Sequence, residues 1–368
     1  MRIKGLWPSR PATLRGVTLP VIAVAALILG GCSAVEFYWQ GLTGQVDILT
    51  RAKPISEVIE STADPALKDR LAKLQAIRAF ASRELALPDN RSYTSYADLG
   101  RPFVLWNVFA APELSLAARQ WCFPVAGCVA YRGYFSESDA RAEAARLTAE
   151  GDDVHVGGVP AYSTLGYFDD PVLSTFARYR EVELARLIFH ELAHQVVYVK
   201  DDTAFNESFA VSVEEEGVAR WLAQEARRRD PAEAARLAAD FERGRRSRSD
   251  FREMIVAARE RLTDIYASNA SDDAKRAAKA AVFADMRAEN ERRRAATDGT
   301  TSFDRWFDAG PNNAGIVAAG LYADRVPQFK AILEEEGGDL PRFYSRVKTL
   351  AALSRSERDV ALAHAAGP

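Results

Sequence analysis

Cysteine and histidine are scarce in this sequence, which has three cysteines and four histidines among 368 residues. Two of the cysteines, Cys122 and Cys128, stand close together, but no further thiol or histidine lies near them in the sequence, which argues against a zinc site there. An excess of positive charge is also absent, because the formal net charge is −3, and this argues against a nucleic-acid partner. Hydrophobic residues, at 48%, are plentiful enough for a substantial core.

The apolar run VIAVAALILGG (21–31) follows a basic N-terminal segment and is too short to predict a membrane-spanning helix. This arrangement is typical of a secretory signal. The run leads directly into LGGC, which resembles a bacterial lipobox, and the resemblance implies cleavage before Cys32 and a lipid on its sulfur. Ser33 follows where an aspartate would imply retention in the inner membrane, so the outer membrane is expected. The alternative is an uncleaved N-terminal anchor with an incidental cysteine.

Export would place Cys122 and Cys128 in an oxidising compartment. There a close pair with Pro124 and Gly127 between its members favours a disulfide. The alternative is a reduced pair in a buried apolar loop, since cysteine is among the most buried residue types.

Helical patterns dominate the two ends of the chain. Residues 34–87 are predicted to be helical, and in 64–87 apolar residues recur every three or four positions until Pro88 ends the helix. From residue 174 onward the pattern is again almost wholly helical. Within that part, the highly charged stretch 222–296 predicts a long helical hairpin with a solvated face.

The middle of the chain has the pattern of strands. β-branched and aromatic residues punctuated by glycine and proline predict strands at 103–110, 128–135 and 153–168. Between the last two, Ser136 and Asp139 are spaced as a capping pair, and this predicts a helix that Gly151 ends.

Two of the histidines lie four residues apart in LIFHELAHQVVYV (187–199), with a glutamate directly after the first. At about 100° per residue, His190 and His194 lie about 40° apart on one helix face, so both imidazoles can reach one metal ion. Glu191 lies beside the open coordination position, where a carboxylate takes a proton from a metal-activated water. Zinc is favoured because imidazole and carboxylate ligands suit it. The alternative is a pair of partly buried histidines satisfied by backbone groups.

The third protein ligand is expected among the carboxylates of FNESFAVSVEEEG (205–217), since cysteine is excluded and the other two histidines carry no motif. FNESFA resembles the asparagine–glutamate ligand segment of the gluzincin metallopeptidases, especially NEGFA of zinc aminopeptidases. The resemblance implies that Glu207 is the ligand and that Glu214, two helical turns further on, supports the site. Counting from the second histidine, as in thermolysin-like gluzincins, selects Glu214 as the ligand instead. Glu207 is preferred because Asn206 and the aromatic context match together, and Glu214 stays open as the alternative.

Five segments in the same order resemble a family of bacterial lipid-anchored proteins described as predicted aminopeptidases. They are WCFPVAGCVAYRGYF, AYSTLGYFDDPVLST, FHELAHQ, FNESFA and NNA…LY. The resemblance implies an α+β, predominantly helical fold, with a zincin-like (gluzincin) catalytic domain and an added charged helical hairpin. The expected divisions are a signal peptide (1–31), an N-terminal helical segment (32–98), a zincin-like core (99–225), the hairpin (226–298) and a C-terminal helical part of the catalytic domain (299–368).

Substrate-binding groups are expected along AYSTLGYF (161–168), interpreted as a strand near the site, because gluzincins hold the substrate backbone along such an edge. The candidates on this segment and directly after it are Tyr162, Gly166, Tyr167, Asp169 and Asp170. The two aspartates could bind a peptide's amino terminus, although DDP is also typical of a turn or a helix cap. Hydrolysis further requires a donor to the tetrahedral oxyanion. Tyr322 is the first candidate, and a role as a core aromatic is its alternative.

Together these patterns predict a zinc-dependent peptidase, in the first place an aminopeptidase, tethered by lipid to the periplasmic face of a bacterial membrane. Its partners would be a peptide substrate and the membrane, with no nucleic acid and no oligomeric state predicted. One alternative is a periplasmic zinc endopeptidase acting on proteins or cell-wall peptides. The other is a non-catalytic lipoprotein, stabilised by zinc, that binds a partner.

Overall fold

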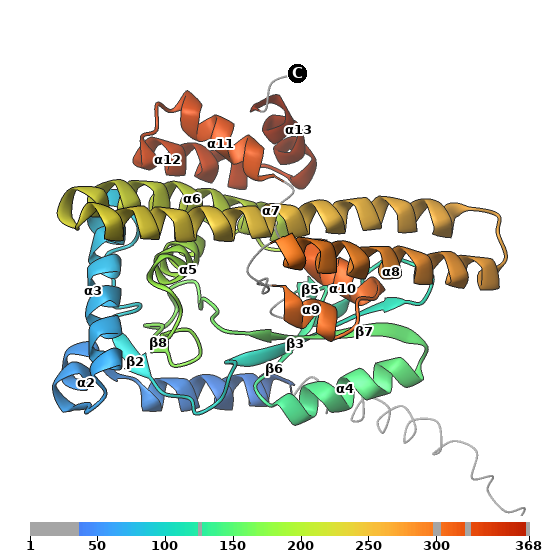
Figure 1. Ribbon diagram of the computed structural model, residues 1–368, viewed down its shortest axis with the longest axis horizontal. Helices are drawn as coiled ribbons and strands as arrows, with labels where there is room; N and C mark the ends of the chain where they lie inside the picture. The colour runs from blue at the N-terminus through green and yellow to red at the C-terminus, as the bar shows by residue number, and fades with distance from the viewer. Residues whose placement is uncertain (1–36, 124–126, 297–302, 321–324, 366–368) are drawn as a thin grey trace, which may run out of the picture. The chain divides into compact units, whose positions relative to one another are not determined.

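The computed structural model describes residues 37–123, 127–296, 303–320 and 325–365 (Figure 1). The chain divides into two compact units, residues 1–46 and 47–368. In the first unit, the described residues 37–46 are helical. The predicted signal peptide and Cys32 lie outside the described residues. None of the described helices has both the length and the apolar character needed to cross a membrane.

The second unit is predominantly helical with small sheets, which agrees with the predicted α+β class. Its elements in chain order are β1 (Lys53–Pro54), α2 (Ile55–Ser61), α3 (Pro65–Leu85), β2 (Ser95–Ala97), β3 (Leu105–Pro112), β4 (Trp121–Phe123), β5 (Gly127–Val129), β6 (Arg132–Tyr134), α4 (Glu137–Ala149), β7 (Asp152–Val159), β8 (Val172–Leu173), α5 (Glu181–His194), α6 (Thr203–Arg228), α7 (Pro231–Ala267), α8 (Asp272–Ala296), α9 (Asp304–Asp308), α10 (Asn313–Gly320), α11 (Val326–Glu335), α12 (Leu340–Ala351) and α13 (Arg355–Ala365).

Two helices begin and end where their capping residues predict. α3 begins after Asp64, whose carboxylate accepts hydrogen bonds from two backbone N–H groups of the first turn. α4 begins after Ser136, whose hydroxyl accepts from the backbone N–H of Asp139 at 3.3 Å. Gly151, with φ +93°, follows the end of α4. The predicted helices at 64–87 and 136–151 are therefore confirmed.

The main sheet has the strand order β6-β3-β7, and both neighbours run antiparallel to β3. Side chains alternate along β3, so that Trp106, Val108 and Ala110 pack against α4 whereas Phe109 packs against α10 on the other face. Figure 1 shows the two helices on opposite sides of these strands. Both faces of the sheet are thus covered, which explains why its central strand is almost uniformly apolar.

The predicted strand at 128–135 is divided between two sheets. β5 forms a hairpin with β4, whereas β6 pairs with β3. Cys122 and Cys128 are opposite each other in the hairpin and are joined by a disulfide. Residues 130 and 131 separate the two strands and carry the chain from one sheet to the other.

The prediction that 161–168 forms a strand is wrong, since β7 ends at Val159 and the following residues form turns. Leu165 and Gly166 have φ values of +57° and +83°, which no extended strand accommodates. Thr164 explains the turn, because both its backbone N–H and its hydroxyl donate to the carboxylate of Asp170. The aromatic and β-branched composition of the segment was therefore misleading.

The central helix of the second unit is α5, which packs against α3, α6 and α7. Its apolar residues, among them Leu184, Ile188 and Leu192, are fully buried in the largest core cluster. Phe205 and Phe209 of α6 extend this core by packing on Phe329 of α11, with ring centroids 5.1 and 5.9 Å apart. α5 and α6 are thus fixed against each other by packing on several sides.

Helices α7 and α8 are two long helices joined by residues 268–271, and they lie side by side in Figure 1. Their apolar residues, including Phe251, Leu262 and Phe283, form a second core cluster to which α9 and α10 contribute.

A buried ion pair ties α13 to the first turn of α6. The guanidinium of Arg358 donates to the carboxylate of Asp202 from Nε at 3.1 Å and from Nη2 at 2.7 Å, across 156 residues of sequence. Asp202 also caps α6 by accepting from the backbone N–H of Phe205 at 3.2 Å. Both charged side chains are almost inaccessible to solvent, and Nη1 of Arg325 lies 3.7 Å from the same carboxylate, so Asp202 faces two guanidinium groups.

Candidate metal centre

His190 and His194 lie one turn apart near the end of α5, as their spacing predicts. Their Nε2 atoms are 3.2 Å apart, and their rings are nearly perpendicular, with an interplanar angle of 86°. Both imidazoles are largely buried, with 15% of the His190 side chain and 10% of the His194 side chain exposed. The two Nε2 atoms therefore face a common point.

Glu207, on the second turn of α6, is the third member of this cluster. Its carboxylate oxygens lie 3.3 Å from His190 Nε2 and 3.6 Å from His194 Nε2. One ligand atom from each of the three residues lies within 4.8 Å of the others, so the cluster could hold a metal ion. Two imidazole nitrogens and one carboxylate oxygen are a donor set that fits zinc.

Asn206 explains how a short connection brings α6 back to α5. Its side-chain oxygen accepts from the backbone N–H of Val199 at 2.7 Å, and its amide nitrogen donates to the carbonyl of the same residue, also at 2.7 Å. This two-way contact closes the turn between the helices, with Asp202 capping α6 inside it. Twelve residues, 195–206, are then sufficient to place Glu207 opposite the histidines.

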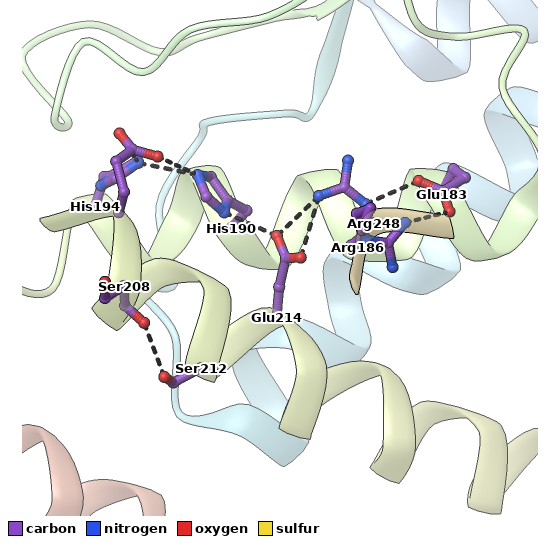
Figure 2. A network of polar contacts seen from close by, with 9 residues as sticks. Glu183, Arg186, His190, His194, Ser208, Ser212, Glu214 and Arg248 are labelled. Atoms are coloured by element: carbon purple, nitrogen blue, oxygen red, sulfur yellow. Dashed lines mark hydrogen bonds and ion pairs between the residues drawn. The ribbon is translucent and has the colours of Figure 1, made fainter. Parts of the chain in front are cut away.

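Glu214, the other carboxylate considered, lies behind His190 rather than in the cluster (Figure 2). Its carboxylate is 2.8 Å from His190 Nδ1 and accepts two hydrogen bonds from Arg186 Nη1, at 3.0 and 3.1 Å. A hydrogen on Nδ1 leaves the Nε2 lone pair of His190 directed at the cluster, which is the tautomer that a metal ligand requires. The geometry thus gives Glu207 and Glu214 different positions, one at the cluster and one supporting it.

A chain of ion pairs continues from Glu214 to α7. Arg186 Nε donates to Glu183 at 2.8 Å, and Arg248 of α7 donates to the other oxygen of Glu183 at 3.2 Å (Figure 2). Burial alone would raise the pKa of Glu214, but the charge of Arg186 and the hydrogen bond with His190 outweigh it and lower the pKa to about 2. Glu214 is therefore held as a carboxylate, which can accept from His190.

Glu191 follows His190 on α5 and is partly exposed to solvent. Desolvation by the surrounding protein raises its pKa to about 7, against the opposing charge of His190. A carboxyl group with a pKa near neutrality can both accept and release a proton at that pH.

The predicted substrate residues lie on the turn that follows β7. Asp170 is buried, and its carboxylate accepts hydrogen bonds from the backbone N–H and the hydroxyl of Thr164. Asp169 is half-exposed and pairs with the exposed Arg91 at 3.4 Å. Tyr162 packs partly buried against the main core, whereas Tyr167 is exposed.

Tyr322 lies outside the described residues. Two described tyrosines, Tyr131 and Tyr198, interact electrostatically with Glu207 and were missed in the sequence. Burial, with smaller effects of Tyr198 and Glu207, raises the pKa of Tyr131 to about 12, so its hydroxyl remains protonated and able to donate.

Arg186 and Arg248 were also missed. Arg186 could have been predicted from the sequence, because it precedes His190 by four residues and therefore lies on the same helix face. No sequence pattern indicates Arg248, since it lies on α7 and contacts Glu183 across 65 residues of sequence.

In this predominantly helical unit, two histidines and a glutamate surround one point that could hold a metal ion, and Glu191 follows directly after the first histidine. Residues 36–362 match the family described as "Putative aminopeptidase", so the chain belongs to that family. This confirms the resemblance to an aminopeptidase family that the sequence motifs indicate. A comparison with curated proteins gave no match, and a comparison with solved structures gave none either.

Proposed function

We propose that this protein is a zinc-dependent aminopeptidase of the gluzincin class with a zincin-like catalytic domain. The observation that carries the proposal is the convergence of His190 Nε2, His194 Nε2 and a Glu207 oxygen within 4.8 Å, next to Glu191. Membership of the aminopeptidase family supports the reaction class. When bound, zinc would supply the Lewis acidity that makes water a nucleophile at neutral pH.

The chain's own residues have separate tasks in this proposal. Glu191 accepts a proton from the attacking water and delivers it to the leaving amine. Glu214 keeps the ligand nitrogen of His190 directed inward through the contact with Nδ1. The oxyanion is stabilised by a tyrosine hydroxyl, for which Tyr322 is the candidate from the sequence and Tyr131 a further one near Glu207.

The test separates metal binding from chemistry. Glu191→Gln removes the proton acceptor without removing a ligand, so zinc content should stay near one per chain while turnover falls at least about a hundredfold. Glu207→Ala should lose the zinc. Retention of zinc in Glu207→Ala with its loss in Glu214→Ala would transfer the ligand assignment to Glu214, and unchanged turnover of zinc-loaded Glu191→Gln would refute the mechanism.

Acetylation of the peptide's amino terminus distinguishes an aminopeptidase from an endopeptidase. An aminopeptidase cleaves peptides with a free amino terminus and leaves their N-acetylated counterparts intact. Equal cleavage of both would instead identify the periplasmic endopeptidase. Zinc bound at full occupancy without cleavage of any peptide would identify the non-catalytic lipoprotein.

We further propose that the protein is anchored through lipid on Cys32 at the periplasmic face of the outer membrane. The disulfide between Cys122 and Cys128 supports export, because disulfides persist in oxidising compartments. Cys32→Ser should abolish incorporation of labelled fatty acid, whereas Cys122→Ser should not. Equal labelling of Cys32→Ser and the unaltered protein would contradict the anchor.

A further inference from the structure

The turn formed by residues 163–170, called here the aromatic turn, is held in one conformation by a buried charge. Asp170 is 4% exposed, and its carboxylate accepts from the backbone N–H of Thr164 at 2.9 Å and from its hydroxyl at 2.8 Å. Thr164 in turn accepts, through its hydroxyl oxygen, from the backbone N–H of Phe168 at 3.1 Å. A carboxylate taken out of water is costly unless such hydrogen bonds compensate it. The two hydrogen bonds from Thr164 compensate the burial of the Asp170 carboxylate and fix the conformation of this turn.

The tip of the aromatic turn combines backbone strain with exposed rings. Leu165 adopts a left-handed conformation, with φ +57°, which costs a residue with a side chain about 1 kcal/mol or more. Tyr167 and Phe168 follow, with 84% and 46% of their surfaces exposed. Exposed apolar side chains are common one at a time. Two adjacent aromatic rings on a turn that is rigidly fixed at an energetic cost are a preorganised apolar surface.

A contact at Gly166 places the aromatic turn against the end of α5. A side-chain carbon at Gly166 would lie 3.5 Å from Oε1 of Gln195, so the turn rests on that side chain. Gln195 follows Glu191 by four residues in helical conformation and therefore neighbours it on the same face of α5. The side chain of Gln195 is fixed in turn, since its Oε1 accepts from Asn90 at 2.7 Å. The aromatic turn thus flanks the face of α5 on which Glu191 lies.

We infer that Tyr167 and Phe168 form an apolar subsite that selects peptides with a large aliphatic or aromatic side chain next to the scissile bond. This inference rests on the proposed function for its substrate, a peptide. The rings would cover one side of the bound side chain, as apolar and aromatic residues do in ligand sites. Contacts of this size discriminate by about tenfold or more between a large apolar side chain and a small or acidic one.

Cleavage and binding are measured on the full-length zinc-loaded protein with free-amino peptides that carry Phe, Leu, Ala or Asp on either side of the cleaved bond. The unaltered protein is used to measure kcat/KM for each peptide. The Glu191→Gln variant, which should leave the peptides uncleaved, is used to measure their binding affinity by calorimetry. We expect Phe and Leu peptides to exceed Asp peptides by about tenfold or more in both measurements. In Tyr167→Ala/Phe168→Ala that ratio should fall to near one, with zinc content and thermal midpoint unchanged.

Two controls separate the subsite from general effects. Tyr167→Phe keeps both rings and should keep the preference. Val360→Ala removes an exposed apolar side chain from α13 and should also leave the preference intact. Because Tyr167 is 84% exposed, Tyr167→Ala alone is expected to fold, and as a second, milder variant it should lose part of the preference.

The outcomes distinguish this inference from the proposed function. An apolar preference unchanged in the double alanine variant, or no preference in the unaltered protein, overturns the inference even if peptides are cleaved. Selective binding that the double variant loses, without cleavage by any zinc-loaded form, supports the apolar subsite and refutes the peptidase.

Discussion

Replacing Glu214 by glutamine tests whether the ion-pair chain behind His190 supports the metal centre. The carboxylate, 2% exposed, accepts from Arg186 on one side and lies 2.8 Å from His190 Nδ1 on the other. Glutamine keeps the volume but is neutral and has one acceptor oxygen. If that oxygen replaces Oε2, which contacts both Arg186 and His190, the NH₂ group replaces Oε1 and places a donor opposite Arg186 Nη1. Glu214→Gln should therefore lose stability and metal affinity together.

Two independent estimates give the size of the stability loss. Holding the pKa of Glu214 at about 2, against an ordinary value of 4.5, corresponds to about 3 kcal/mol at pH 7. Removing one partner of a buried ion pair typically costs about 3–5 kcal/mol. Because the folded-state pKa is the lower one, the contribution is fully present above pH 4.5 and is lost as the pH falls toward 2. It should still amount to about 2 kcal/mol at pH 3.5.

Urea unfolding of the metal-free protein at pH 7 and pH 3.5 measures this contribution, and chelator competition measures zinc affinity, which should weaken about 10–100-fold. The matched control is Glu215→Gln, on the next residue of α6, whose carboxylate pairs with Lys330 of α11 instead. Equal stability and zinc affinity in Glu214→Gln and the unaltered protein would show that the ion-pair chain does not support His190.

Two further predictions concern the rest of the fold. Arg358→Met should lower the free energy of unfolding by up to about 3–5 kcal/mol, because it removes both hydrogen bonds to the buried Asp202 and leaves only Arg325, 3.7 Å away, as its counter-ion. Adding Asp202→Asn should recover much of this loss in urea unfolding, and a double variant as unstable as the single one would contradict the ion-pair explanation. Removal of the disulfide by Cys122→Ser/Cys128→Ser should cost only roughly 2–3 kcal/mol, since the closed loop is short. Protein alkylated without reductant should take up no label at these cysteines, and two labels per chain would show that the bridge does not form.

The features that the sequence predicts correctly depend on neighbouring residues. Ser136 and Asp139 predict where α4 begins, because a capping group acts within its own first turn. The pair His190 and His194 is equally local, since four residues make about one helical turn. Glu207 was predicted from the resemblance of FNESFA to the gluzincin ligand segment, because its position opposite α5 depends on how the turn between α5 and α6 closes.

The features that the sequence does not predict depend on partners far along the chain. The segment 161–168 has the composition of a strand, yet the hydrogen bonds from Thr164 to Asp170 override that preference. Arg248 joins the network behind His190 through Glu183, and no periodic pattern connects α7 with α5. Such contacts arise from tertiary packing, which a local pattern does not encode.

The ion pair between Asp202 and Arg358 has a consequence for the timing of biosynthesis. A ribosome that adds about 5–20 residues per second needs roughly 10–30 s to proceed from Asp202 to Arg358, 156 residues later. During most of that interval all three candidate ligands have been synthesised, but Asp202, which caps α6, lacks Arg358, the nearer of its two cationic partners. A fragment that stops before α13 therefore contains the complete ligand set but keeps only the more distant of the two cations at Asp202, and it is expected to bind metal more weakly than the complete protein.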